Sequence, residues 1–173
     1  MKNLIAYFSR KGYNHVNGKI EFLPVGNTEV AAKKLQEMTG GDLFEIRRAE
    51  PYPEDYQACV QESVRELKAA ARPALADDMP DVSGYDRIYL GYPSWCGTMP
   101  MPVFTFLASC DLAGKTICPF CTNEGSGLGH SVEDIKAACP QAQVLPGLSL
   151  RGATVAESDG EIKAWLETLP DGE

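Results

Sequence analysis

The 173 residues of this chain suffice for one domain with its own core, residues 1–173, and 44% of them are hydrophobic. Sixteen basic and 24 acidic residues give a formal net charge of −8. Such a surface argues against nucleic acid or an anionic membrane as the main partner and would suit a basic protein. The N-terminal apolar run is too short for a signal peptide, and no run approaches the roughly 18 apolar residues of a membrane span. We therefore expect a cytoplasmic protein.

The first half of the chain alternates apolar runs with segments of helical spacing. Residues 4–8 are continuously apolar, as expected for a strand that is buried on both faces. From Thr28 onward apolar residues recur with a helical period until Gly40-Gly41, a typical glycine stop. The pattern then predicts a strand at 43–46, a helix over 56–67 and a third strand at 88–90.

The same alternation continues in the second half. It predicts a helix from 103 to 107, a strand at 116–121, a helix over 132–139, a broken fifth strand at 144–150 and a last helix over 162–169. Pro119 stands inside the fourth strand and removes a ladder donor there, so it marks either a bulge or the end of regular pairing. Five strands that alternate with five helices predict an open α/β sheet with helices on both faces.

Ligands of such sheets bind beyond the carboxyl ends of the strands. The first loop at this edge begins with Ser9-Arg10 and ends with Gly26-Asn27-Thr28, where the first helix opens. The N–H groups and the positive dipole end of a helix form a natural phosphate site. Ser9, Asn27 and Thr28 could add side-chain donors, and Arg10 could add a cation. The alternative is an ordinary Asn or Thr helix cap.

The loop after the third strand contains a tryptophan at the expected rim of the sheet. It reads Tyr92-Pro93-Ser94-Trp95-Cys96-Gly97-Thr98-Met99-Pro100. Its prolines stiffen the backbone, and the flat side chain of Trp95 could stack on a planar ligand. The alternative is a tryptophan that only covers a helix end.

The loop after the fourth strand is rich in glycine. It reads Thr122-Asn123-Glu124-Gly125-Ser126-Gly127-Leu128-Gly129. Its composition permits a close approach of the backbone to a ligand, although a flexible strand-to-helix turn would look the same. Its spacing is not that of the dinucleotide fingerprint. Each loop alone is weak evidence, but all three meet at the one edge where ligands bind.

These loops resemble the flavodoxin superfamily, in particular a flavodoxin-like branch whose second loop has the form GYPxWxGTMP. The resemblance covers essentially the whole chain. It is most specific at Tyr7-Phe8-Ser9 with Gly26-Asn27-Thr28, at 91–100, and at 119–122 with Gly125-Ser126-Gly127. It implies a three-layer, doubly wound, five-stranded parallel sheet of order 2-1-3-4-5, with FMN as the cofactor.

The resemblance also implies which residues bind the cofactor. The phosphate would be held by Ser9, Arg10, Asn27 and Thr28. One side of the isoalloxazine ring would be contacted by Pro93, Ser94, Trp95, Cys96 and Gly97. The other side would be lined by Thr122, Asn123, Gly125, Ser126 and Gly127.

Two departures from the flavodoxin pattern bear on function. The compact phosphate loop is split by an insertion of residues 12–25, in which Asn17-Gly18 favours a two-residue hairpin turn. This hairpin would either fold over the cofactor or bind a partner. The third loop also has no aromatic residue, whereas many flavodoxins enclose the ring between two aromatic side chains. One face of the ring would then be open to a substrate.

The cysteines offer a second redox candidate. Cys118 and Cys121 have the spacing of a dithiol motif, but positions three apart on a strand face opposite sides of a sheet. Cys96 should lie near the flavin, where a packing role is the simpler interpretation. We therefore expect reduced thiols, no metal site and no catalytic residue of the protein's own.

The leading functional hypothesis is an FMN-binding electron carrier that serves a redox partner protein, possibly a basic one. A first alternative is an NAD(P)H-dependent quinone or nitro-compound reductase on the same fold, suggested by the open third loop. A second alternative is a binding domain with a vestigial flavin site.

Overall fold

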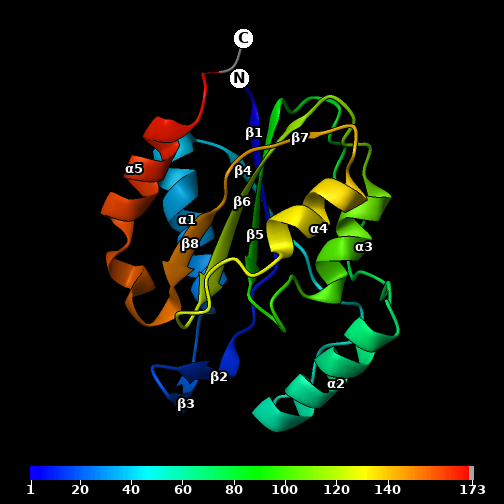
Figure 1. The fold of residues 1–173 in the computed structure, drawn as a ribbon, viewed down its shortest axis with the longest axis vertical. Coiled ribbons are helices and arrows are strands. Elements are labelled where there is room, and N and C mark those ends of the chain that lie inside the picture. Colours follow the sequence, from blue (N-terminus) through cyan, green and yellow to red (C-terminus); the bar gives the residue numbers. More distant parts are fainter. Residues whose placement is uncertain (172–173) are drawn as a thin grey trace.

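The computed structural model of the protein describes residues 1–171. Its centre is a parallel sheet in the order β4-β1-β5-β6-β7, with β8 also paired to β6 (Figure 1). The strands are β1 (Asn3–Tyr7), β4 (Asp42–Glu45), β5 (Arg87–Pro93), β6 (Thr116–Asn123), β7 (Gln143–Val144) and β8 (Leu148–Arg151). Because β7 and β8 are two pieces of one outer strand, the predicted order 2-1-3-4-5 is confirmed.

Both faces of the sheet are buried, which explains the continuous apolar runs of its strands. Leu4, Ala6 and Ile88 belong to the apolar core on one face, whereas Ile5 and Tyr89 belong to the core on the other face. Neighbouring residues of a strand point to opposite sides of a sheet, so a strand with helices on both faces has no polar alternation.

Helices cover the two faces as a doubly wound fold requires. α1 (Asn27–Thr39) packs with α5 (Asp159–Thr168) on one face, and α3 (Met101–Ser109) packs with α4 (Ser131–Ala138) on the other (Figure 1). α2 (Tyr56–Lys68) contacts α3 and extends past the carboxyl edge of the sheet. The predicted helices are all present, with ends that differ by a few residues. A 3-10 helix, η1 (Gly152–Glu157), was not predicted.

Pro119 of β6 is paired regularly with β5 on one side and faces the gap between β7 and β8 on the other. It pairs with Leu90 of β5, so β6 is not interrupted there. On the other side, the N–H of Leu145 donates to the carbonyl of Ile117 over 2.9 Å. The backbone groups of alternate residues in a strand point toward the same neighbouring strand, so those of Pro119 point the same way as those of Ile117. The missing N–H of Pro119 therefore faces the break between β7 and β8, where no ladder partner is lost.

Residues 12–25 form a hairpin of their own beyond the carboxyl edge of the sheet. β2 (Gly12–Val16) pairs antiparallel with β3 (Lys19–Leu23), and Asn17 and Gly18 at the turn both have positive φ, of 51° and 80°. This is the backbone that a type I′ turn needs. Figure 1 shows the hairpin at the end of the molecule opposite to the two termini. Within residues 1–171, no helix is both long and apolar enough to cross a membrane.

Candidate functional site

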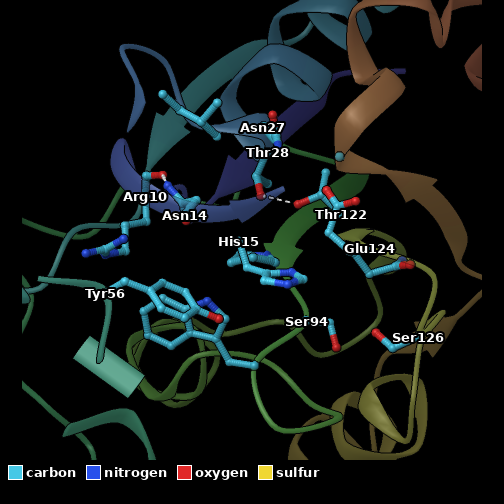
Figure 2. Close-up of a pocket in the computed structure, with 15 residues that line it drawn as sticks. Arg10, Asn14, His15, Asn27, Thr28, Tyr56, Ser94, Thr122, Glu124 and Ser126 are labelled. Atoms are coloured by element: carbon cyan, nitrogen blue, oxygen red, sulfur yellow. Dashed lines mark hydrogen bonds between the residues drawn. The ribbon is translucent and has the colours of Figure 1, made fainter. Parts of the chain in front are cut away.

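A cavity of about 260 Å³ lies at the carboxyl edge of the sheet, where the three loops and the hairpin meet (Figure 2). Four segments supply most of its lining: the hairpin, the start of α1, and the loops that follow β5 and β6. It is lined by Arg10, Asn14, His15, Leu23, Asn27, Thr28, Tyr56, Pro93, Ser94, Trp95, Thr122, Asn123, Glu124, Ser126 and Gly152.

One end of the cavity is the N-terminus of α1. Gly26 is its N-cap and offers no side chain, so the cap comes from elsewhere: the Oγ of Ser9 accepts from the N–H of Glu29 over 3.0 Å. A Cβ on Gly26 would lie 2.1 Å from that Oγ and 2.9 Å from the backbone carbonyl of Arg10. Gly26 thus permits a close approach of two chain segments. The N–H groups of Asn27 and Thr28 lie in the first turn of α1, where amides have no acceptor within the helix and can bind an anion.

Short polar side chains fix this end to the sheet. The hydroxyls of Thr28 and Thr122 share a buried hydrogen bond of 2.8 Å, which joins α1 to β6. Beside them, Gly152 leaves room for the side chains of Asn27 and Glu124, because a Cβ there would lie 2.4 Å from Nδ2 of Asn27 and 2.8 Å from Oε1 of Glu124. That Oε1 is buried and has no hydrogen-bond donor among the described residues.

The other end of the cavity is aromatic. Trp95 packs edge-on against Phe8 and Tyr52, with ring centroids 5.2 and 5.0 Å away. His15 of the hairpin and Tyr56 at the start of α2 are stacked, with centroids 6.4 Å apart and an interplanar angle of 30°. Figure 2 shows Tyr56 well away from Asn27 and Thr28, with His15 between them in this view. The cavity is therefore polar at one end and aromatic at the other, which suits an anionic tail joined to a flat ring.

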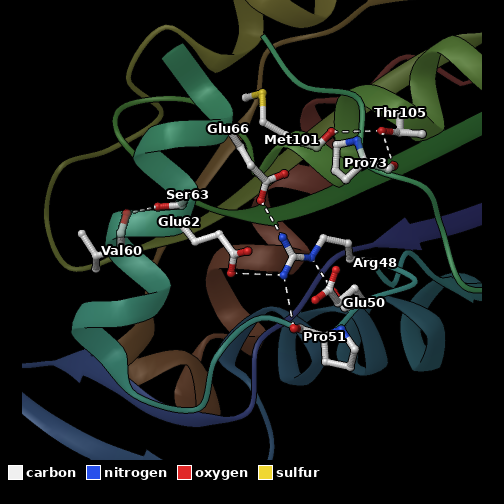
Figure 3. A network of polar contacts seen from close by, with 10 residues as sticks. All are labelled: Arg48, Glu50, Pro51, Val60, Glu62, Ser63, Glu66, Pro73, Met101 and Thr105. Atoms are coloured by element: carbon white, nitrogen blue, oxygen red, sulfur yellow. Dashed lines mark hydrogen bonds and ion pairs between the residues drawn. The ribbon is translucent and has the colours of Figure 1, made fainter. Parts of the chain in front are cut away.

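Arg48 is the centre of a buried ionic network (Figure 3). The guanidinium of Arg48 donates to Glu66 over 2.9 Å and to Glu62 over 3.2 Å, and it lies 3.6 Å from the ring centroid of Tyr52. The Arg48 side chain is only 8% exposed and that of Glu66 only 11%. Burial, with the Glu66 carboxylate, raises the pKa of the Tyr52 hydroxyl far above its usual value. Tyr52 is thus held between the network and Trp95.

The hairpin is fastened at both ends across the cavity. At its base, Arg10 donates to the carbonyls of Pro53 and Glu54 over 2.9 Å each, directly before α2. At its tip, the N–H of Asn17 donates to Oε2 of Glu124 over 3.2 Å, and Arg151 donates to Oδ1 of Asn17 over 3.3 Å. The hairpin therefore spans from the first loop to the third loop.

Nine of the fourteen residues predicted for cofactor binding line the cavity. They are Arg10, Asn27, Thr28, Pro93, Ser94, Trp95, Thr122, Asn123 and Ser126. The guanidinium of Arg10 is nevertheless occupied by backbone carbonyls, including that of Tyr13, and not by the α1 terminus. That Arg10 holds phosphate stays a prediction.

The other five predicted residues shape the loops. Ser9 caps α1, as described above. Cys96 is exposed at φ 55° and Gly97 follows at φ 77°, so both turn the second loop back toward β5. The N–H groups of Gly125 and Gly127 donate to Oδ1 of Asn123 over 3.0 and 3.1 Å, which folds the third loop around that side chain.

Six lining residues were not predicted: Asn14, His15, Leu23, Tyr56, Glu124 and Gly152. Three belong to the hairpin, whose place over the cavity depends on the long-range contacts of Arg10 and Asn17. Glu124 could have been inferred, because it stands within the third loop next to Asn123. Tyr56 carried no signal beyond a helical apolar position.

The Cys118–Cys121 pair is packed as core. Both thiols are fully buried, Cys118 on the α1 and α5 face and Cys121 on the α3 and α4 face. Burial raises the pKa of each thiol to about 12. Neither forms thiolate readily, and they face away from each other.

Comparison with known proteins agrees with this architecture. The family model described as Flavodoxin matches residues 2–169. A candidate flavoprotein from Bacteroides eggerthii DSM 20697 is 31% identical with a TM-score of 0.80, over 99% of both chains. One from Bacteroides uniformis ATCC 8492 is 30% identical with a TM-score of 0.77, over 96% of this chain and 98% of that one.

More distant similarity concerns the fold alone. A flavoprotein in complex with FMN from Lactobacillus acidophilus NCFM is 20% identical with a TM-score of 0.67, over 95% of this chain and 98% of that one. The comparison with curated proteins gave no match.

Proposed function

This chain belongs to the flavodoxin family, and on that premise we propose that it is an electron carrier whose redox group is FMN. The observation that carries the proposal is the two-ended cavity, with the α1 terminus at one end and Trp95 at the other. The family binds FMN, and the residues present here fit each part of that molecule.

The polar end fits the phosphate and the sugar-alcohol chain of FMN. The first-turn amides of α1 and the side chains of Asn27 and Thr28 would hold the phosphate, because a helix N-terminus stabilises an anion without a nearby cation. Glu124 lines the cavity, and its carboxylate would accept from a hydroxyl of the chain that joins phosphate and ring.

The aromatic end fits the isoalloxazine ring. Trp95 and the backbone of Pro93 and Ser94 would contact the ring and exclude water from it. When bound, FMN supplies the exchange of electrons, and the protein sets the potential through the contacts and charges around the ring. The net charge of −8 disfavours an anionic reduced flavin and favours a redox partner with a basic docking surface.

The first experiment is reconstitution of the purified protein with FMN, followed by flavin fluorescence. We expect the fluorescence to be quenched on binding, and riboflavin, which lacks the phosphate, to bind at least about tenfold more weakly. A protein that binds neither molecule would overturn the proposal and leave only the interpretation as a vestigial flavin site.

The second experiment separates a carrier from a reductase. The FMN-loaded protein is titrated under anaerobic conditions with NADPH and then with dithionite, and visible absorbance is recorded. Reduction by dithionite alone is expected of a carrier that receives electrons from a partner protein. Rapid reduction by NADPH, with reoxidation by a quinone, would instead assign the chain to the NAD(P)H-dependent quinone or nitro-compound reductases.

A further inference from the structure

We propose that His15 and Tyr56 contact the flavin ring and keep small electron acceptors from stacking on it. The proposal rests on FMN binding as argued above and deepens it, because it assigns a selectivity role to the hairpin. The acceptors that the site would reject are flat two-electron acceptors such as quinones.

The wall of the cavity has few aromatic side chains. Among residues 1–171, three aromatic side chains line the cavity, namely Trp95, His15 and Tyr56. The third loop contributes Thr122, Asn123, Glu124 and Ser126, none of which can stack. The aromatic surface that this loop lacks is therefore supplied from the hairpin and from the first residue of α2.

The rings of His15 and Tyr56 are held in place. Tyr56 begins α2, whose N-cap Asp55 accepts from the N–H of Ala58 over 2.8 Å. His15 stacks on Tyr56, and Arg10 ties the base of the hairpin to the residues just before this cap. The same fastening fixes both rings relative to the cavity.

The tip of the hairpin is also held in place. Asn17 is bonded both to Glu124 and to Arg151, so the hairpin is closed over the cavity on the side of the third loop as well. A flat acceptor needs a free ring face for two-electron transfer, because the reacting atoms must come into contact. A protein partner can receive electrons at an exposed edge of the ring without entering the cavity.

The test is the reoxidation of the photoreduced, FMN-loaded protein by a small benzoquinone in an anaerobic stopped-flow instrument. In this reaction the reduced flavin gives two electrons, and two protons accompany them, so that the quinone becomes a quinol and the flavin returns to its oxidised form. The compared proteins are the wild type, His15→Ala, Tyr56→Ala and the double variant.

The matched control is Tyr13→Ala. Tyr13 is on the same strand as His15 and is 47% exposed, but it does not line the cavity. We expect the double variant to be reoxidised faster than the wild type by about tenfold or more, which is typical of removing a steric selectivity contact. The single variants should be reoxidised at rates between those of the wild type and the double variant. The Tyr13→Ala protein should be reoxidised at the rate of the wild type.

The FMN dissociation constant and the thermal midpoint of each protein are measured in parallel. A wild type that does not bind FMN contradicts the proposed function itself. A wild type that binds FMN but is reoxidised as fast as the double variant overturns only the present inference. An equal acceleration in Tyr13→Ala would also overturn it, because the effect would then come from general loosening of the hairpin. Since His15 is exposed, its substitution alone keeps the test usable if the double variant unfolds.

Discussion

The two ends of the cavity are held in place by different kinds of structure. The polar end is held by regular elements: α1 and β6 are joined by Thr28 and Thr122, and the close approach at Gly26 brings the first loop onto the helix. At the aromatic end, irregular segments are held by side chains: Arg48 and Glu66 support Tyr52, which supports Trp95.

This difference shows what each end tolerates. The polar end depends on the close approach of backbone segments, so it is sensitive to added atoms. The aromatic end depends on a few charged and aromatic groups, so it is sensitive to their removal. The following predictions test that contrast.

The largest effect is expected for Arg48→Met. It removes the cation between two carboxylates and leaves Glu66 buried without its partner, which costs about 3 kcal/mol of unfolding free energy. The neighbouring Arg47 pairs with Asp77 at the surface, with side chains 54% and 44% exposed, so Arg47→Met should cost far less than Arg48→Met. Urea denaturation of both variants measures the difference. Equal losses would refute the assigned role of the Arg48 network.

A somewhat smaller effect is expected for Gly26→Ala. The added Cβ would meet the Oγ of Ser9 and the backbone of Arg10, so we expect a loss of about 1–3 kcal/mol and weaker FMN binding. The control is Gly84→Ala, because a Cβ at Gly84 meets no atom within 4 Å. Unfolding curves and fluorescence titrations with FMN distinguish the two. Unchanged FMN affinity in Gly26→Ala would show that the first loop does not shape the polar end of the cavity.

The hydrogen bond between Thr28 and Thr122 should have a moderate effect. Thr28→Val or Thr122→Val alone leaves one buried hydroxyl unpaired and should cost about 1–2 kcal/mol. The double variant should cost less than the sum of the two, because neither hydroxyl then remains. A double-mutant cycle in urea gives the coupling energy. Strict additivity would mean that the two hydroxyls do not interact in solution.

The smallest effect concerns Glu45 and pH. Glu45 is exposed, but desolvation by the surrounding protein, followed by repulsion from Glu29, raises the pKa of its carboxyl in the folded protein. Because the folded pKa is raised, the contribution of Glu45 to stability is fully present below its unfolded pKa and is lost as pH rises through the folded pKa. Glu45→Gln should therefore gain stability relative to the wild type as pH rises from about 4, near the unfolded pKa of a glutamate, to above the folded pKa of Glu45. A pH-independent difference in the urea midpoint would contradict this.

The sequence was sufficient for the sheet and for the helix start at the polar end of the cavity because both depend on local patterns. Continuous apolar runs reveal strands that are buried on both faces, and Gly26-Asn27-Thr28 marks a helix opening beside the first strand. Pro119 was ambiguous, because the break that it faces belongs to another strand.

The aromatic end could not be predicted in the same way. Tyr52 and His15 lie in an irregular segment and an insertion, where no periodicity assigns a direction to a side chain. Their positions follow from the Arg48 network and from the contacts of Arg10, which join residues 14–44 positions apart in the chain. Such pairings are fixed only when the whole chain has folded.

The break in the outer strand has a consequence for behaviour at high concentration. An exposed sheet edge offers unpaired backbone groups to other copies of the chain, and long flat edges promote aggregation. Here one edge is the four-residue β4, and the other is divided into β7 and β8 by Pro146 and Gly147 opposite Pro119. Neither edge offers a long continuous template, so the protein is protected from edge-to-edge association even when it is abundant.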